Sequence, residues 1–240
     1  MSNINFDFSP LLEYAEKNNI KIPENTVESL SLYGNLLLEW NEKINLTAIK
    51  EPEEIVVKHF IDSLSLLKII NPKDGESLID VGTGAGFPGM VIKILRPELN
   101  VTLLDGHAKR FIFLEDLQNQ LNIKTENLYI RAELAAKDLK YREKFDYATA
   151  RAVARLNTLS EYCLPFVKKG GKFIAMKGPG AEEELIEAKK AISILGGKEP
   201  SLIKEELPMD NTRNFIIVSK INPTGEKYPR ASAKISKNPL

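Results

Sequence analysis

Residues 78–89 read LIDVGTGAGFPG, and this stretch decides which kind of fold the chain adopts. An apolar run that carries one carboxylate, Asp80, is followed by four glycines in eight residues. Each glycine costs conformational entropy on folding, so a tight turn that binds nothing is a poor explanation. An apolar run that ends in such a loop is typical of a central strand whose carboxyl end holds a ligand.

Short β-rich runs alternate with helical patterns on both sides of the glycine loop. Helical patterns such as 89–97 and 108–122 separate the first strands, which predicts an α/β fold with a mostly parallel sheet and helices on both faces. Only a turn, residues 208–211, separates the last two strands, so the sheet should end in an antiparallel hairpin. The seven expected strands cover residues 77–82, 100–106, 126–132, 145–151, 170–178, 198–207 and 213–221.

The first seventy residues contain helical patterns and no strand pattern. Helices are expected over 9–19, 24–46 and 51–70, and the second of them places apolar side chains along one stripe. We therefore divide the chain into an N-terminal helical cap, residues 1–71, and an α/β domain, residues 72–240, that ends in a basic tail.

The composition excludes several classes of protein. Charges interrupt every hydrophobic run, and the N-terminus lacks a basic start followed by an apolar stretch, so we expect a cytoplasmic protein with no membrane segment. A single cysteine, Cys163, allows no internal disulfide. Two histidines, with no H-x-x-x-H or C-x-x-C spacing, make us expect no metal site.

Two kinds of ligand could occupy the glycine loop. The loop contains a G-x-G-x-x-G fingerprint, and Asp105 follows about twenty residues later, as in dinucleotide-binding proteins. However, Gly82 and Thr83 are inserted between the strand and the fingerprint, and Asp80 would repel a pyrophosphate. Pro88 also removes a backbone N–H at the helix start, where a pyrophosphate would be bound.

S-adenosylmethionine suits these residues better than a dinucleotide. The glycines let the chain approach its methionine part, Asp80 offers negative charge near the amine or sulfonium, and Asp105 can bind both ribose hydroxyls. The pair Ala132-Glu133 follows the third strand, from which a loop could cover the adenine. Glu133 could equally be a favourable charge at a helix N-terminus.

The residues that could carry chemistry point to an acceptor with a free lone pair. No Asn/Asp-Pro-Pro-aromatic motif follows the fourth strand, and Cys163 reads as a helix core residue. His59, Asp62 and Ser63 lie on one short helix and cannot converge as a hydrolase triad, so His59 is expected to pack or hydrogen-bond between the cap and the sheet.

The polar side chains expected near the strand ends are mainly basic. Arg151 should face the cofactor, with Arg155 one helical turn later, and such a pair can bind phosphate or the O6/N7 edge of guanine. The alternative for Arg151 is an ion pair with Asp146 or Asp80. The net charge of the chain is zero, so RNA would have to meet a local patch. We predict that this patch joins Arg151, Arg155, the cluster from Lys168 to Lys177, and the tail around Arg230, with Phe87 or Tyr228 stacking on a base.

Six segments resemble one known family, the ribosomal RNA small subunit methyltransferase G family, also called glucose-inhibited division protein B. They occur in the same order and at compatible spacing from about residue 36 onward. The segments are NLTAI (45–49), HFIDSL (59–64), DVGTGAGFPG (80–89), ARAVA (150–154), MKG (176–178) and YPR (228–230). The resemblance implies a class I methyltransferase fold that transfers a methyl group from S-adenosylmethionine to N7 of a guanine in 16S rRNA.

The resemblance also implies positions for the cofactor. Together with the loop reading above, the cofactor-binding residues that we predict are Gly82, Gly84, Phe87, Asp105, Gly106, His107, Ala132, Glu133 and Arg151. The predicted RNA-binding residues are Arg155, Lys177 and Arg230. The chain departs from the family pattern after the second strand, where the family usually reads Asp-Ser-Leu and this chain reads Asp105-Gly106-His107, and in its tail, which lacks a glycine soon after YPR.

Methylation at N7 requires no base, because the lone pair is free and no proton leaves. We therefore predict no dedicated catalytic residue and expect the site to work by placing N7 in line with the methyl group. The expected partner is 16S rRNA or the small ribosomal subunit, and the expected state is a monomer. Two other functions stay open at this point: a nicotinamide-dependent oxidoreductase, and a non-catalytic RNA-binding module.

Overall fold

A seven-stranded sheet in the order β3-β2-β1-β4-β5-β7-β6 confirms the predicted fold class. The computed structural model describes residues 4–240. Strands β1 to β5 run parallel, whereas β7 is antiparallel to both β5 and β6, which is the predicted terminal hairpin. The strands are β1 Ser77–Val81, β2 Asn100–Asp105, β3 Glu126–Tyr129, β4 Phe145–Arg151, β5 Val167–Lys177, β6 Ser201–Leu207 and β7 Asn211–Ser219.

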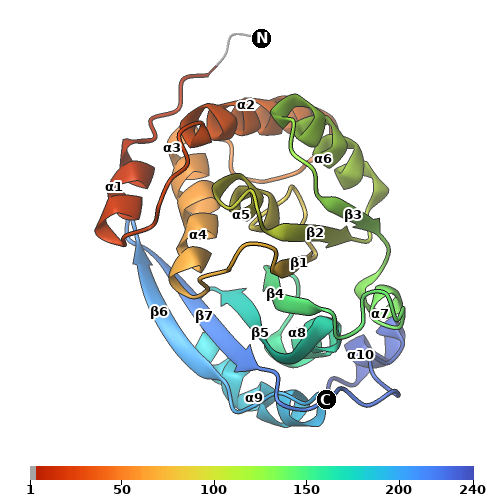
Figure 1. Cartoon of the computed structure of the whole chain (residues 1–240). Helices are drawn as coiled ribbons and strands as arrows, with labels where there is room; N and C mark the ends of the chain where they lie inside the picture. The colour runs from red at the N-terminus through yellow and green to blue at the C-terminus, as the bar shows by residue number, and fades with distance from the viewer. Residues whose placement is uncertain (1–3) are drawn as a thin grey trace.

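The helices follow the strands in the expected alternation (Figure 1). The cap consists of α1 Ser9–Lys17, α2 Thr26–Ile44 and one helical segment that joins α3 Pro52–Ile55, η1 Val56–Ile61, α4 Asp62–Leu64 and η2 Ser65–Lys68. The remaining helices are α5 Gly89–Leu95, α6 Ala108–Leu121, α7 Ala132–Ala135, α8 Leu156–Cys163, η3 Leu164–Phe166, α9 Ala181–Ile194 and α10 Ser232–Lys237. The third expected strand is too long, because the chain leaves β3 after Tyr129 and begins α7 at Ala132.

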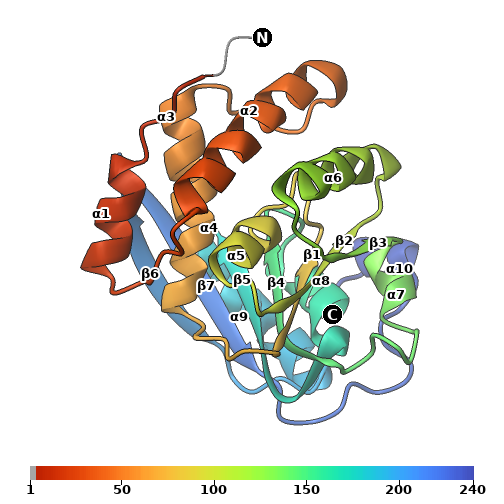
Figure 2. The same cartoon turned by 45° about the horizontal axis from the view of Figure 1, so that its top comes forward.

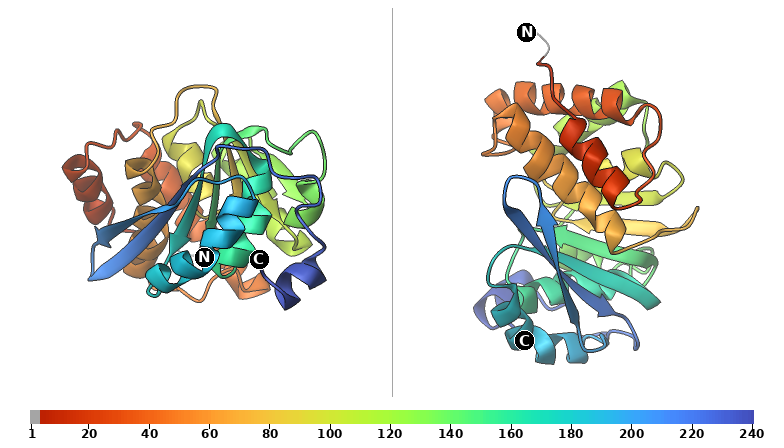
Figure 3. Two further views of the ribbon diagram at one scale, coloured as in Figure 1. Left: turned by 90° about the horizontal axis from the view of Figure 1, so that it is seen from below. Right: turned by 90° about the vertical axis from the view of Figure 1, so that its left-hand side faces the viewer.

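Each face of the sheet buries its own apolar cluster. Leu78 of β1 faces one cluster and its neighbour Ile79 faces the other, as the alternation of side chains along a strand requires. The first cluster contains the cap, α5 and α6, and the second contains α8 and α9. Figure 2 shows the two helical layers on either side of the strands, and Figure 3 shows the same arrangement from two further sides. The cap therefore shares one core with the α/β domain.

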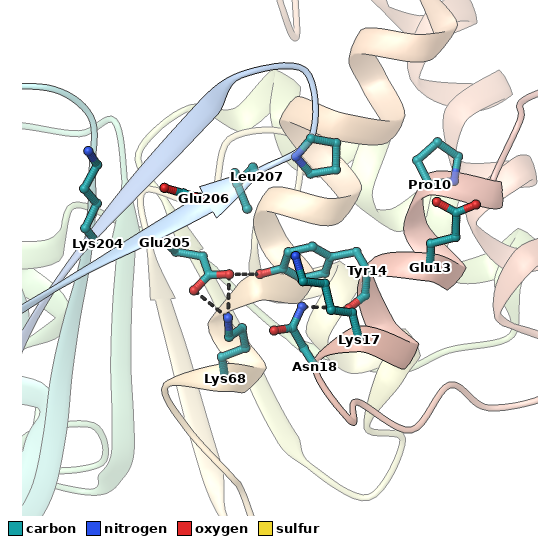
Figure 4. A pocket seen from close by; sticks show the side chains of 11 residues that line it. Pro10, Glu13, Tyr14, Lys17, Asn18, Lys68, Lys204, Glu205, Glu206 and Leu207 are labelled. Carbon is teal, nitrogen blue, oxygen red and sulfur yellow. Dashed lines mark hydrogen bonds and ion pairs between the residues drawn. The ribbon is translucent and has the colours of Figure 1, made fainter.

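The cap is fixed to the rest of the molecule by polar contacts at its edges. Trp40 of α2 donates through Nε1 to the Asp116 carboxylate of α6 at 2.7 Å. At the other end, the Tyr14 hydroxyl of α1 donates to Glu205 of β6 at 2.7 Å, and Lys68 of η2 donates to both oxygens of the same carboxylate at 2.6 Å (Figure 4).

These last contacts line a cavity of about 570 Å³ between α1, η2 and β6. Burial and the neighbouring Glu205 raise the pKa of Tyr14 far above its ordinary value, so its hydroxyl stays protonated and available as a donor. Tyr14, Lys68 and Glu205 satisfy one another in this cavity, and we interpret the group as a connection between the first helix and the last hairpin.

Candidate functional site

A second cavity, of about 410 Å³, lies at the carboxyl ends of β1, β2 and β4, where the strand order reverses on either side of β1. Open α/β sheets bind their ligands at this position. We call it the strand-end cavity, and its lining consists of Val81, Gly82, Leu104, Asp105, Gly106, His107, Arg110, Arg131, Ala132, Glu133, Ala152, Val153 and Tyr162.

Gly82 makes the turn that opens the cavity. Its φ angle of +74° lies in the left-handed region, and a Cβ atom there would come within 2.6 Å of Val153 Cγ2. Both the backbone conformation and the space therefore require glycine. Gly84 has a φ angle of +62°, and its N–H donates to the Asp105 carboxylate at 3.0 Å. The glycine loop is thus tied directly to the end of β2.

Asp105 is the central polar group of the cavity, and its two oxygens accept four hydrogen bonds. Oδ1 accepts from the backbone N–H of His107 at 2.9 Å and from its ring Nδ1 at 3.0 Å. Oδ2 accepts from Gly84 and from Arg110 Nη1, the latter at 2.7 Å. Burial opposes ionisation, but the donors Arg110, His107 and Gly84 prevail and hold the pKa of Asp105 below its ordinary value. The carboxylate is therefore charged, and because four donors already use its acceptor positions, a ribose hydroxyl would bind by displacing one of them.

The opposite wall comes from the start of α7 and from α8. Glu133 lies in the first turn of α7, is buried, and accepts from Arg131 Nε at 2.7 Å. Glu133 is thus a favourable charge at a helix N-terminus and also lines the cavity, so its position is compatible with both predicted roles, the helix charge and the contact with adenine. The sequence reasoning did not select Arg110, Arg131 or Tyr162. Arg131 directly precedes the predicted pair Ala132-Glu133, whereas no local signal distinguishes Tyr162.

Three predicted cofactor residues, Gly84, Phe87 and Arg151, are not part of the lining of the strand-end cavity. The Phe87 ring is 4% exposed and is held between Tyr33, at 5.0 Å between ring centroids, and His59, at 4.4 Å. The Arg151 guanidinium lies 5.1 Å from the Phe87 centroid. In this position Phe87 cannot stack on an RNA base, because both of its faces are covered.

Arg151 belongs to a buried ion cluster. Asp62, which is 0% exposed, accepts from Arg151 Nη1 at 2.7 Å and from Arg213 Nε at 2.6 Å and Nη2 at 3.0 Å. The expected alternative partners of Arg151, Asp146 and Asp80, were therefore wrong, because helix α4 brings Asp62 closer. We call the group of Tyr33, His59, Asp62, Phe87, Arg151 and Arg213 the cap junction.

His59 has the role that the sequence predicted, between the cap and the sheet. Its Nε2 lies 2.8 Å from Thr47 Oγ1 and its Nδ1 lies 3.3 Å from Arg151 Nη2. Burial, with the charge of Arg151, lowers the pKa of His59 to about 3, so the ring is neutral near pH 7.

Asp80 accepts hydrogen bonds from the glycine loop on its buried side and does not line the strand-end cavity. Its Oδ2 accepts from the Thr83 hydroxyl at 2.7 Å and from the Gly89 N–H at 2.8 Å. Its Oδ1 has no hydrogen-bond partner among residues 4–240, and burial raises the pKa of Asp80 to about 6. The strand turns this side chain into the core, so direct contact between Asp80 and a ligand in the cavity is not supported, and its charge near an amine or sulfonium stays a prediction.

The predicted basic patch is dispersed. Lys168 lies near the start of β5 and Lys177 at its end, so the two residues lie at opposite ends of this strand and do not form one cluster. Lys177 is paired with Glu184 at 2.7 Å, and Arg230 with the buried Glu161 at 2.6 Å.

The other two proposed RNA contacts differ from each other. Arg155 is exposed, and its guanidinium pairs with Glu187 at 2.6 Å. Tyr228 is buried, so its ring is not free to stack on a base. Within residues 4–240, no helix is long and apolar enough to cross a membrane, and no group of three His, Cys, Asp or Glu side chains could hold a metal ion.

Comparisons with known proteins agree with this geometry. A family model described as rRNA small subunit methyltransferase G matches residues 26–213. The chain is 48% identical over 224 residues to the ribosomal RNA small subunit methyltransferase G of Clostridium botulinum (strain ATCC 19397 / Type A), covering 92% of this chain and 94% of that protein. It is 50% identical over 232 residues to the protein of the same name from Acetivibrio thermocellus, covering 96% and 95%.

Solved structures resemble the fold at low sequence identity. A methyltransferase from Pyrococcus furiosus matches with a TM-score of 0.54 and 17% identity, covering 82% of this chain and 100% of that chain. A variant of the 16S rRNA (adenine(1408)-N(1))-methyltransferase from Catenulisporales acidiphilia matches with a TM-score of 0.53 and 13% identity, covering 63% and 88%. At these identities the structural matches establish the fold alone.

Proposed function

Because the chain belongs to the rRNA small subunit methyltransferase G family, we propose that it methylates N7 of a guanine in 16S rRNA, with S-adenosylmethionine as the methyl donor. The observation that carries the proposal is the strand-end cavity, in which a glycine turn and an ionised Asp105 meet at the switch point of a methyltransferase fold. The cofactor supplies an electrophilic methyl group on a positively charged sulfur.

The residues of the cavity fit this cofactor from end to end. The left-handed turn at Gly82 leaves room for the methionine part, because a side chain there would collide with Val153. Asp105 can accept hydrogen bonds from two ribose hydroxyls. Ala132 and Glu133 lie across the cavity from the glycine turn and would flank the adenine. We retain Gly106 and His107 as neighbours of the ribose, because both line the cavity.

A nicotinamide dinucleotide fits the same loop less well. The N–H of Gly89 at the start of α5 donates to Asp80 and is therefore not free for a pyrophosphate. The buried Asp80 carboxylate would also repel phosphate oxygens at this helix start. In a thermal melt, S-adenosylhomocysteine should raise the midpoint of the protein and NADH should leave it unchanged. Stabilisation by NADH alone would support the oxidoreductase.

The chemistry that we propose requires placement and no proton transfer. Holding guanine N7 in line with the methyl group can lower the barrier by roughly 7–11 kcal/mol. The single-turnover rate at saturating cofactor and RNA should therefore lack a bell-shaped pH profile. A bell with both limbs assigned to protein groups would contradict this mechanism.

The RNA must be recognised without an extensive basic face. The predicted contacts Lys177 and Arg230 are engaged with Glu184 and Glu161, which leaves Arg155, exposed beside Glu187, as the most available of the three. We propose the small ribosomal subunit or its 16S rRNA as the substrate, a monomer as the working state and a strongly salt-dependent encounter.

The decisive experiment is to map N7-methylguanosine in 16S rRNA from cells with and without this protein. One position should lose its methyl group when the protein is absent and regain it when the wild-type chain is restored. A chain with Gly82 replaced by valine should not restore it. If that variant still restored the modification, cofactor binding at the glycine turn would be excluded. If the map never changed, a non-catalytic RNA-binding role would become the better proposal.

A further inference from the structure

Three of the motifs that distinguish this chain meet in one chain of hydrogen bonds. Thr47 comes from NLTAI, His59 from HFIDSL and Arg151 from ARAVA. Arg151 Nη2 lies 3.3 Å from His59 Nδ1, and His59 Nε2 lies 2.8 Å from Thr47 Oγ1. The chain therefore runs from the end of β4, through the cap junction, to the loop that joins α2 to α3.

The direction of these hydrogen bonds follows from the donors. A guanidinium can only donate, so His59 Nδ1 must be the acceptor and the ring proton must be on Nε2. His59 Nε2 then donates to Thr47 Oγ1. The backbone N–H of Ile49 donates to the same oxygen at 3.1 Å. Both lone pairs of the Thr47 hydroxyl are thus occupied, and its own proton must find an acceptor elsewhere.

No acceptor for this proton is present among residues 4–240. The loop around Thr47 is nevertheless held in place, since Asn41 Oδ1 accepts from the N–H groups of Leu46 at 2.6 Å and of Thr47 at 2.9 Å. Thr47 itself is half-buried, and its neighbours Ala48 and Lys50 are exposed. The result is a hydroxyl donor whose orientation is fixed by two incoming hydrogen bonds and whose proton points away from them.

The position of this donor relates it to the reaction. Arg151, at the other end of the chain of hydrogen bonds, is followed directly by Ala152 and Val153, which line the strand-end cavity. Open α/β sheets bind their ligands at the carboxyl ends of the strands, so we expect the nucleotide to lie near this end of β4. Thr47 belongs to the cap and is separated from Arg151, at the end of β4, by the His59 ring alone.

We propose that Thr47 is a substrate-recognition residue, which donates its hydroxyl proton to an oxygen of the RNA nucleotide that is methylated. The inference rests on the proposed function, and it adds a contact to the RNA where the cofactor residues supply none. The acceptor is either the O6 keto oxygen of the target guanine or a phosphate oxygen beside it. Both are acceptors that a hydroxyl donor can recognise.

Two substitutions at Thr47 and one matched control test the proposal. Thr47→Val keeps the shape and removes the hydroxyl, both as a donor and as the acceptor of His59 and of the Ile49 N–H, whereas Thr47→Ser keeps the hydroxyl. The control, Ser63→Ala, removes a fully buried hydroxyl that donates to the His59 carbonyl in the same helix. The measurements are kcat/KM for the small subunit at saturating S-adenosylmethionine, and the Kd for S-adenosylhomocysteine.

Thr47→Val should lower kcat/KM for the RNA about tenfold, because a hydrogen bond between uncharged groups contributes at most about that factor. The Kd for S-adenosylhomocysteine should stay unchanged. Thr47→Ser and Ser63→Ala should stay within about twofold of wild type. Unchanged kcat/KM in Thr47→Val, or a loss in Thr47→Ser as large as in Thr47→Val, would overturn the proposal. Should Thr47→Val not fold, Thr47→Cys decides in the same way, because a thiol is only a weak donor.

A second arm identifies the acceptor and keeps this inference separate from the proposed function. A subunit whose target guanine is replaced by 2-aminopurine lacks O6 but keeps N7. If Thr47 contacts O6, wild type and Thr47→Val should methylate this substrate equally; if it contacts phosphate, the tenfold ratio should persist. Wild-type protein that binds the cofactor yet methylates neither subunit would instead refute the proposed function.

Discussion

The strand-end cavity and the cap junction lie on opposite sides of the same glycine loop, yet they solve different problems. In the cavity, His107 is 73% exposed and Arg131 61% exposed at their side chains, so the polar groups can rearrange around a ligand. In the junction, Asp62 is inaccessible to water and both faces of Phe87 are covered. The comparison teaches that the loop is fixed from its buried side and left accessible on the side of the cavity.

The difference also explains why motif residues do not all touch the ligand cavity. Phe87 and Arg151 belong to the most distinctive segments of the chain, but they hold the loop and the cap together. Their position determines where Gly82 stands, since the Phe87 ring anchors the far end of the same loop. A residue can thus matter for a site without lining it.

Asp62→Ala should have the largest effect, because it leaves Arg151 and Arg213 without their shared anion in a buried place. Breaking such a pair typically costs about 3–5 kcal/mol in the free energy of unfolding. Urea denaturation followed by circular dichroism measures this. Glu187→Ala, which removes the exposed partner of Arg155, is the control and should change the stability little. Equally small changes in the free energy of unfolding for Asp62→Ala and Glu187→Ala would mean that the buried ion cluster contributes no more stability than a surface ion pair.

The pH dependence of stability tests whether ionised Asp80 destabilises the folded chain on the buried side of the loop. Its pKa of about 6 in the folded chain exceeds the ordinary 3.8, so the folded state binds the extra proton between these pH values and loses stability as the pH rises. Asp80→Asn removes this titration. The stability of Asp80→Asn relative to wild type should therefore increase by about 1.4 kcal/mol per pH unit from pH 4 to pH 6.

Denaturation curves at several pH values in this window check the prediction for Asp80. The opposite slope that His59 contributes, because its folded pKa is lowered to about 3, is the same in both proteins and cancels in the difference. A pH-independent difference would show that Asp80 is ionised without penalty in the folded chain.

Gly82→Ala tests the open side of the loop. The new Cβ would displace Val153 and shift the turn. We expect a loss in affinity for S-adenosylhomocysteine, measured by isothermal titration calorimetry. Gly170→Ala is the matched control, because Gly170 also has a positive φ angle, +88°, but open space around its Cβ position. Equal affinities in both variants would refute the proposed turn.

His107→Ala should have the smallest effect and the opposite sign. The His107 ring occupies Oδ1 of Asp105, where a ribose hydroxyl would bind, so its removal should raise the affinity for S-adenosylhomocysteine about twofold to fivefold. Lys109→Ala, a neighbouring exposed cation, serves as the control for lost charge. A weaker affinity in His107→Ala than in Lys109→Ala would indicate that the ring contacts the ligand instead of competing with it.

Much of the fold could be predicted because its signals are local. The alternation of short apolar runs with helical patterns placed all seven strands within three residues of their observed bounds, and the turn at 208–211 predicted the terminal hairpin. The third strand was drawn too long, since RAEL at 131–134 begins a helix whose first turn packs near the cavity. The division between residues 1–71 and 72–240 stays a prediction, although the cap and the sheet share one core.

The candidate site could be predicted where a residue's role follows from its backbone. Gly82 is required by a left-handed turn and was predicted from the glycine-rich loop and the family resemblance, whereas Asp105 was predicted from its spacing and its place at the end of a parallel strand. The partners of long charged side chains could not be found in this way. Arg151 reaches Asp62, Arg230 reaches Glu161, and Lys177 reaches Glu184, each across more than five positions of the chain.

The sequence by itself determined the class of fold, the position of the glycine turn and the family, because hydrophobic period, glycine spacing and short motifs are properties of neighbouring residues. Only the tertiary structure decided that Phe87 and Asp80 are buried, that Lys168 and Lys177 lie at opposite ends of β5 and that the Thr47 proton has no acceptor among residues 4–240. The reason is physical: burial, ion pairing and the direction of a hydrogen bond depend on which distant side chains share the same space.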